Sequence, residues 1–166
     1  MKNPRSSAFP PETVREVRDR CLCLHAQRAA RALARWFDAA LKPFGLTNGQ
    51  FSLLMALNRP DGPRISDLAP FLAMDRTTLT AALKVLERRG LVESAADAED
   101  RRNRRLALTD AGRDLLVAAV PAWRAAHDRL DADLGGTDLD ALREGLGGLG
   151  RIGPGEDTRE KKGRAR

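Results

Sequence analysis

The residues best suited to chemistry lie in one segment, MDRTTLTAALKVLERRGLV, at positions 74–92. Its apolar residues recur at three- and four-residue steps, so they share one face of a helix. They are Leu79, Ala82, Leu83 and Leu86. The other face carries hydroxyl groups and cations, which bond phosphate oxygens and base edges in a DNA major groove. Basic helix faces are also common where nothing binds, so the flanking sequence must decide.

The flanking residues favour a helix-turn-helix. Asp75 is placed to cap the segment, and Gly90 is placed to end it. A shorter helix precedes it, capped by Ser66 and with Leu68, Ala69 and Leu72 facing inward. Two short helices joined by a tight turn, the second of them basic, are typical of a DNA-reading motif.

A β-hairpin is predicted directly after the motif, with strands at 91–94 and 104–108. The tip between them is rich in acidic residues and arginines. An arginine on such a tip can enter a minor groove, where the potential is most negative. Taken alone, the tip would be interpreted as a solvated loop. Beside a helix-turn-helix it is interpreted as a wing.

Long helices are predicted at both ends of the chain. The apolar spacing indicates one helix over 12–42, a shorter one from Thr47 with a Thr47–Gln50 capping box, and a long one over 109–134 that Pro121 should kink. A last short helix carries leucines at three- and four-residue steps, at Leu139, Leu142, Leu146 and Leu149. A small winged lobe cannot cover so much apolar helix, which favours a second copy of the chain as partner.

Composition limits the function. The 166 residues include 29 Lys and Arg against 23 acidic residues, a formal charge of +6 that favours an anionic partner. The sequence shows no bilayer-spanning run and no signal peptide, so we expect a cytoplasmic protein. It also lacks a glycine-rich phosphate loop, a set of metal ligands and a nucleophile with a nearby base. We therefore expect no enzyme activity, no cofactor and no metal.

Together these features resemble the MarR family of winged helix-turn-helix transcription regulators. The matching segments are GLTNGQFSLLMAL at 45–57, the segment at 74–92, and DAEDRRNRRLALTDAG at 97–112, with its Asp-Arg pair and Leu-Thr-x-x-Gly. The resemblance implies a mainly α fold with a small β-hairpin wing and a single domain over 12–152. Within it, 47–108 form the winged lobe and 12–42 and 109–150 form dimerisation helices. Residues 1–11 are expected to be a flexible arm and 153–166 a disordered basic tail.

The resemblance also implies a function: a homodimeric regulator that binds a pseudo-palindromic operator. Such proteins usually act as repressors released by a small molecule or an oxidant, although the sequence does not distinguish a repressor from an activator. By position, Asp100 would orient the wing, Arg102 would enter the DNA minor groove, and Arg101 or Arg104 would contact the DNA backbone. The implied contacts outside the wing are Ser66, Arg76, Thr77, Thr78, Thr80 and Lys84. The alternative is a winged-helix dimerisation protein without specific DNA readout.

Two kinds of sensor are compatible with the sequence. The family's organic-hydroperoxide sensors carry a reactive Leu-Cys near the start of the first helix, where Leu22 and Cys23 stand here, but those sensors hold the thiol with tyrosines and this chain has none. Cys23 is otherwise a buried structural thiol. On one continuous helix Cys21 and Cys23 would lie about 200° apart, so Cys21 could resolve an oxidised Cys23 only across subunits. The other candidate is a pocket for a phenolic or carboxylate effector, lined by His25, Arg28, Trp36 and Phe51.

Overall fold

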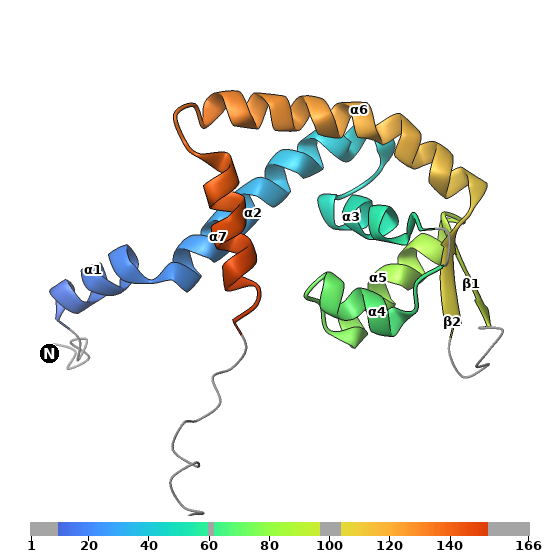
Figure 1. Ribbon diagram of the computed structural model, residues 1–166, viewed down its shortest axis with the longest axis horizontal. Helices are drawn as coiled ribbons and strands as arrows, with labels where there is room; N and C mark the ends of the chain where they lie inside the picture. Colours follow the sequence, from blue (N-terminus) through green and yellow to red (C-terminus); the bar gives the residue numbers. More distant parts are fainter. Residues whose placement is uncertain (1–9, 60–61, 97–103, 153–166) are drawn as a thin grey trace, which may run out of the picture.

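The computed structural model describes residues 10–59, 62–96 and 104–152 (Figure 1). The predicted tail at 153–166 and most of the predicted arm lie outside these ranges. The described chain is mainly helical with one antiparallel hairpin, as predicted. Its elements are α1 (Pro11–Arg20), α2 (Leu22–Leu41), the 3₁₀ helix η1 (Lys42–Phe44), α3 (Asn48–Leu57), α4 (Ile65–Phe71), α5 (Arg76–Arg88), β1 (Val92–Ala96), β2 (Arg104–Leu108), α6 (Asp110–Asp133) and α7 (Leu139–Leu149).

The two long helices, α2 and α6, pack along each other, and α3 lies against both (Figure 1). The helices α4 and α5 and the hairpin complete a winged lobe on the other side of α3. One apolar core runs through the lobe and into the long helices, from Phe37 on α2 to Ala126 on α6. The core leucines Leu54, Leu79 and Leu86 have no exposed surface. This packing fixes the orientation of α5 on the lobe.

The junction between the hairpin and α6 explains the Leu-Thr-x-x-Gly pattern. The Thr109 hydroxyl donates to the Gly90 carbonyl oxygen at 2.7 Å and accepts from the Gly112 amide at 3.1 Å. A Cβ at position 112 would collide with the Leu91 carbonyl oxygen. Thr109 therefore caps α6 and ties it to Gly90, just after α5, and only glycine at position 112 allows α6 to approach so closely.

The single helix expected over 12–42 is wrong, because the chain breaks at Cys21 into α1 and α2. Cys21 has extended backbone angles (φ −75°, ψ 100°), and its sulfur accepts from the Leu24 amide at 3.4 Å. The sulfur thus takes the N-cap role for α2. Residues of α1 bury nothing, so no packing holds α1 in line with α2. Apolar spacing correctly indicated helical structure on both sides of Cys21, but it did not predict the break between α1 and α2.

The predicted start of α4 is also wrong. Ser66 is not the cap: Arg64 holds the capping position and the helix begins at Ile65. Arg64 forms an isolated antiparallel bridge with Arg105 on β2, and its amide donates to Asp67 at 3.1 Å. Pairing with the hairpin keeps Arg64 extended, so the helix begins immediately after it.

The α6 helix runs without interruption through Pro121, and its ribbon curves along its length (Figure 1). Ala119 and Ala126 are fully buried on its inner side. Beyond it, α7 begins at the Asp138 cap, whose carboxylate accepts from the Ala141 amide at 2.9 Å. The ends of the chain differ from the lobe, because α1 and α7 bury no residue. No helix in the described ranges is long and apolar enough to cross a membrane.

Candidate nucleic-acid interface

The recognition helix α5 is held firmly at its start. The Asp75 carboxylate accepts from the Thr78 amide at 2.8 Å and from the Thr78 hydroxyl at 2.6 Å. These bonds hold the pKa of Asp75 below its usual range, and the bond from the Thr78 hydroxyl has the largest effect. Leu79, Leu83 and Leu86 are buried on the inner side, as their spacing predicts. The opposite face is therefore turned to solvent.

The exposed face of α5 carries the predicted DNA-contacting residues. Arg76, Thr77 and Lys84 are exposed, and Thr80 is partly buried. The Thr80 hydroxyl donates to the Arg76 carbonyl oxygen at 2.7 Å, which leaves its lone pairs free to accept. The Thr78 hydroxyl likewise uses its proton, which it donates to the Asp75 cap. Ser66, exposed on α4, donates to Asp67 at 3.2 Å. The face can thus offer two cations and several hydroxyls to an anionic polymer.

A groove of about 300 Å³ separates α5 from the hairpin, and Thr80, Lys84, Ser94 and Arg104 are among the residues that line it. Arg104 is tied across the hairpin to Ser94. The other predicted wing residues, Asp100, Arg101 and Arg102, lie outside the described residues. The structure therefore brings helix α5 and the hairpin together around one groove.

Two contacts that were not predicted from the sequence connect the end of α5 to α3, and α3 to the long helix α2. Arg89, which follows α5, donates to the Gln50 side-chain oxygen at 3.3 Å. That same oxygen accepts from Thr47 in the predicted capping box, which the structure confirms. Asp38 on α2 accepts from the Asn48 amide at 2.6 Å. These partners are distant in sequence, so no local pattern could have identified them.

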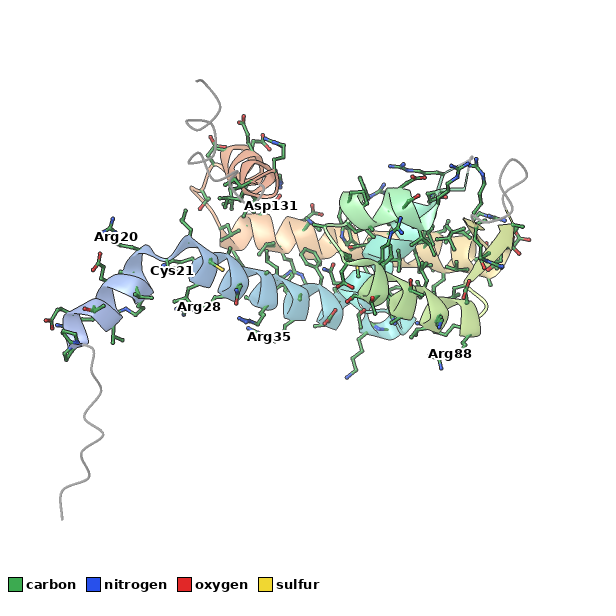
Figure 2. All side chains as sticks on the ribbon, turned by 90° about the horizontal axis from the view of Figure 1, so that it is seen from below. Arg20, Cys21, Arg28, Arg35, Arg88 and Asp131 are labelled. Atoms are coloured by element: carbon green, nitrogen blue, oxygen red, sulfur yellow. The ribbon has the colours of Figure 1, made fainter. Side chains whose placement is uncertain are left out.

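Cys21 lies at the bend between α1 and α2 (Figure 2), and Cys23 lies in the first turn of α2. Cys23 is exposed, and its sulfur accepts from the Gln27 amide group at 3.2 Å. Cys21 is partly buried at the helix cap. Because they are not on one continuous helix, the geometric objection to a bond between them within one chain does not apply.

The four predicted effector-binding residues do not line one cavity. Trp36 lies beside a 570 Å³ hollow between α2 and α6, where its indole N–H donates to the Ala126 carbonyl oxygen. Phe51 lines a different cavity, and His25 and Arg28 line neither. Both of the latter are exposed on α2, from which Arg28 and Arg35 project to the same side (Figure 2).

The cavity at Phe51 measures about 530 Å³ and lies between α3, the end of α4 and α6. Its walls are aromatic: Phe51 stacks on Trp123 with ring centroids 5.9 Å apart, and Phe71 lies beneath the Arg59 guanidinium at 5.3 Å. Arg59 and Arg124 make the lining cationic. The cavity therefore has the aromatic and cationic character predicted for an effector site, and it shares only Phe51 with the four predicted residues.

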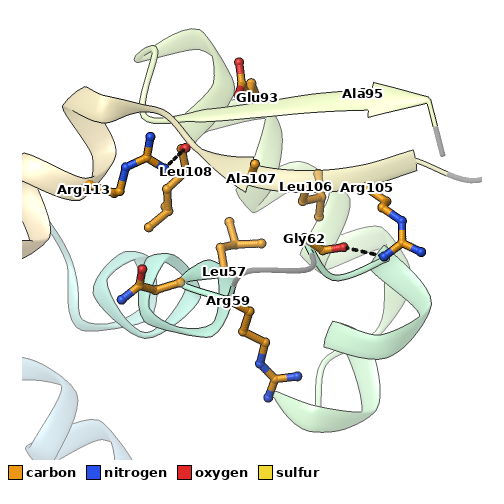
Figure 3. A pocket seen from close by; sticks show the side chains of 11 residues that line it. Leu57, Arg59, Gly62, Glu93, Ala95, Arg105, Leu106, Ala107, Leu108 and Arg113 are labelled. Atoms are coloured by element: carbon orange, nitrogen blue, oxygen red, sulfur yellow. Dashed lines mark hydrogen bonds between the residues drawn. The ribbon is translucent and has the colours of Figure 1, made fainter. Parts of the chain in front are cut away.

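A further hollow of about 690 Å³ flanks the hairpin (Figure 3). Leu57, Leu106 and Leu108 line it. At its edges Arg113 donates to the Leu108 carbonyl oxygen at 2.7 Å and Arg105 to that of Gly62 at 3.3 Å. These arginines hold the backbone around the hairpin.

Comparison with known proteins agrees with this geometry. The MarR family model matches residues 46–103, which include the winged lobe from α3 to β1. The transcriptional activatory protein BadR of Rhodopseudomonas palustris is 34% identical over 116 residues, 68% of this chain and 66% of BadR, just under two thirds of that protein.

Two solved structures of DNA complexes are also similar. The Mycobacterium tuberculosis regulator MosR with DNA is 41% identical with a TM-score of 0.71, and the match covers 78% of this chain and 93% of MosR. The transcriptional repressor CouR on a 23-mer duplex is 34% identical with a TM-score of 0.73, covering 81% and 96%. The chain therefore belongs to the MarR family of DNA-binding transcriptional regulators, which are not enzymes.

Proposed function

We propose that this protein is a homodimeric repressor that binds a pseudo-palindromic operator through α5 and the wing. The observation that carries the proposal is the exposed face of α5, with Arg76, Thr77 and Lys84 beside the hairpin groove. Cations supply phosphate contacts and steer association, while hydroxyls and the arginine fork read base edges. Ser66 and the wing residues Arg101 and Arg102 add contacts on either side.

The chain ends support two copies. Val14 on α1 is 61% exposed, and Leu142 and Leu146 on α7 are 45% and 48% exposed. In the domain that we propose over 12–152, segments 12–42 and 109–150 would bury these faces against a second chain. Two lobes related by a two-fold axis would then present their α5 helices to successive major grooves, about 34 Å apart.

Fluorescence anisotropy with a duplex from upstream of the protein's own operon tests DNA binding. Arg76→Ala should weaken binding by about 1–3 kcal/mol, and Arg102→Ala by a similar amount if Arg102 enters the minor groove. The control is Arg31→Ala, which removes one exposed charge from α2. Equal affinity of the wild type for operator and unrelated DNA would support the alternative, a dimerisation protein without specific readout.

The sign of regulation needs a separate measurement, because BadR is named an activatory protein and CouR a repressor. A reporter gene driven by the bound promoter should be expressed more strongly when the protein is absent. Lower expression in its absence would identify an activator.

We propose that the signal is an aromatic carboxylate or phenol bound in the cavity at Phe51. The Phe51–Trp123 stack provides a flat apolar surface, and Arg59 and Arg124 provide cations for a carboxylate. A ligand there would contact both α6 and the end of α4, which directly precedes the recognition helix. It could therefore change the spacing of the two α5 helices.

Tryptophan fluorescence tests the cavity, because the chain has only two tryptophans. In a Trp36→Phe variant, benzoate and hydroxycinnamate should quench Trp123 and release labelled operator over the same concentration range. Arg124→Ala should weaken both effects about tenfold. Quenching without release would exclude the cavity as the signalling site.

A second candidate signal is thiol oxidation, which the exposure of Cys23 favours. A Cys23 thiolate would attack the O–O bond of an organic hydroperoxide, giving a sulfenic acid and the alcohol. Cys23→Ser should bind the operator normally but no longer be released by cumene hydroperoxide, while Cys21→Ser tests the partner thiol. Unchanged release of Cys23→Ser would eliminate this candidate.

A further inference from the structure

Arg104 makes an unusual set of contacts for a residue predicted to hold DNA. Its Nε donates to the Ser94 hydroxyl at 3.0 Å, and its Nη2 donates to the same hydroxyl at 2.8 Å and to the Ser94 carbonyl oxygen at 2.6 Å. Three of the five guanidinium N–H groups are therefore directed at one residue. Only the Nη1 end remains for any other partner.

The contact runs diagonally across the hairpin. In the strand register Arg104 pairs with Ala96, whereas Ser94 pairs with Leu106, so the side chain reaches two pairs along the ladder, toward the base of the wing. A two-stranded ribbon is weakly held on its own and takes its twist from such cross-strand contacts. Arg104 is thus placed to fix the twist of the hairpin at the point where the described part of β2 begins.

The same residues border the groove between α5 and the hairpin. Ser94 and Arg104 line the hairpin side, and Thr80, Lys84 and the acidic Glu87 are among the residues that line the α5 side. Lys84 is exposed and makes no ion pair with the described residues. The side of the groove that belongs to α5 therefore has an available cation, while the cation on the hairpin side is largely engaged with Ser94.

We propose that Arg104 is a positioning residue that sets the width of this groove through Ser94, and that Lys84 across the groove makes the phosphate contact. This rests on the proposed DNA-binding function and sharpens it, because the sequence predicted that either Arg101 or Arg104 contacts the DNA backbone. Ser94, which has no charge and no predicted contact with DNA, becomes a determinant of operator affinity.

Salt dependence separates the two roles, because each phosphate contact contributes about 0.9 to the slope of log affinity against log salt. Lys84→Ala should lower the slope by about that amount. Ser94→Ala should weaken operator binding about tenfold with the slope unchanged. Ser94→Thr, which keeps the hydroxyl, should restore affinity, and Arg104→Ala combined with Ser94→Ala should be no weaker than Arg104→Ala alone.

Circular dichroism and thermal melting of each variant verify that the lobe is folded. If Arg104→Ala lowers the slope by about 0.9 while Ser94→Ala binds like the wild type, Arg104 is a direct contact and the inference is wrong. That result leaves the proposed function intact. If the wild type binds no operator, both the proposed function and this inference fail.

Discussion

Helices α5 and α7 have similar apolar spacing but differ in how far their apolar side chains are buried. On α5, Leu79, Leu83 and Leu86 are at most 2% exposed. On α7, Leu142, Leu146 and Leu149 are 40–48% exposed. Repeated three- and four-residue steps define which face of a helix is apolar, but they do not determine what covers it. The apolar face of α5 is covered by its own lobe, whereas the apolar face of α7 is left partly exposed by the described residues.

The two regions also differ in how their glycines are used. The α7 helix contains glycines at 145, 147 and 148, each of which weakens a helix unless packing compensates. Gly112, at the boundary of the lobe, instead permits a close approach between α6 and Leu91. The lobe is therefore stabilised within one chain, and α7 requires an additional surface. The predictions below test this contrast.

The largest effect is expected where α7 would meet a second chain. Leu142→Glu with Leu146→Glu places charges on the apolar face. Each leucine has about half of its surface left to bury, worth about 1 kcal/mol, so four leucines in a pair of chains lose about 4 kcal/mol. Sedimentation velocity should show a dimer for the wild type and monomers for the double variant.

The matched control is Ala141→Glu, which adds a charge to the same helix about 120° from the leucine face. It should remain dimeric. If the double variant also sediments as a dimer, α7 is not part of the interface and the contrast between the regions has another cause.

A smaller effect is expected at the junction of the lobe with α6. Gly112→Ala should reduce the free energy of unfolding by about 1–3 kcal/mol, because the added methyl group meets the Leu91 carbonyl oxygen and the backbone must shift. Urea unfolding at fixed protein concentration measures it. Gly49→Ala, also in the first turn of a helix but with open space around the new methyl group, is the control. Equal stability of the two variants would contradict the close approach.

A third prediction concerns the turn between α4 and α5. Ala73 has a left-handed backbone, with φ at 50°, which glycine adopts without strain. Ala73→Gly should therefore stabilise the lobe, by about 0.5–1 kcal/mol. Ala81→Gly, on the exposed face of α5, should destabilise it by about 1 kcal/mol. Opposite signs in thermal melts would support the strained turn, whereas a loss of stability in both variants would not.

The sequence was most informative where local chemistry determines structure. The Asp75 cap, the Thr47–Gln50 box and the strand at 104–108 are as predicted, because each depends on residues only a few positions apart. The break at Cys21 and the start of α4 at Ile65 were not predicted. The first follows from missing packing around α1, and the second from pairing with a strand about 40 residues away.

For the candidate site too, the sequence predicts local features but not contacts between residues that are distant in the chain. The exposed face of α5 could be predicted from spacing alone. The engagement of Arg104 with Ser94, and the separation of Trp36 and Phe51 into different cavities, depend on how distant elements pack. Residue type identified the groups that can bind an anion, but only the structure identified which of them are already occupied.

The smallest effect is expected at the Asp75 cap, and pH distinguishes it from the others. Bonds from Thr78 lower the pKa of Asp75 in the folded chain, so the cap stabilises α5 above the ordinary carboxyl pKa of about 3.9 and loses this contribution as pH falls through the folded value. Asp75→Ala should lower the melting temperature by at most about a few degrees at pH 7, with the difference from wild type shrinking below pH 4. Asp75→Asn keeps a capping oxygen without a titrating group, so its pH dependence should follow that of the alanine variant while its stability stays closer to wild type. A constant difference between wild type and Asp75→Ala from pH 7 to 3 would mean that the carboxylate charge does not stabilise the recognition helix.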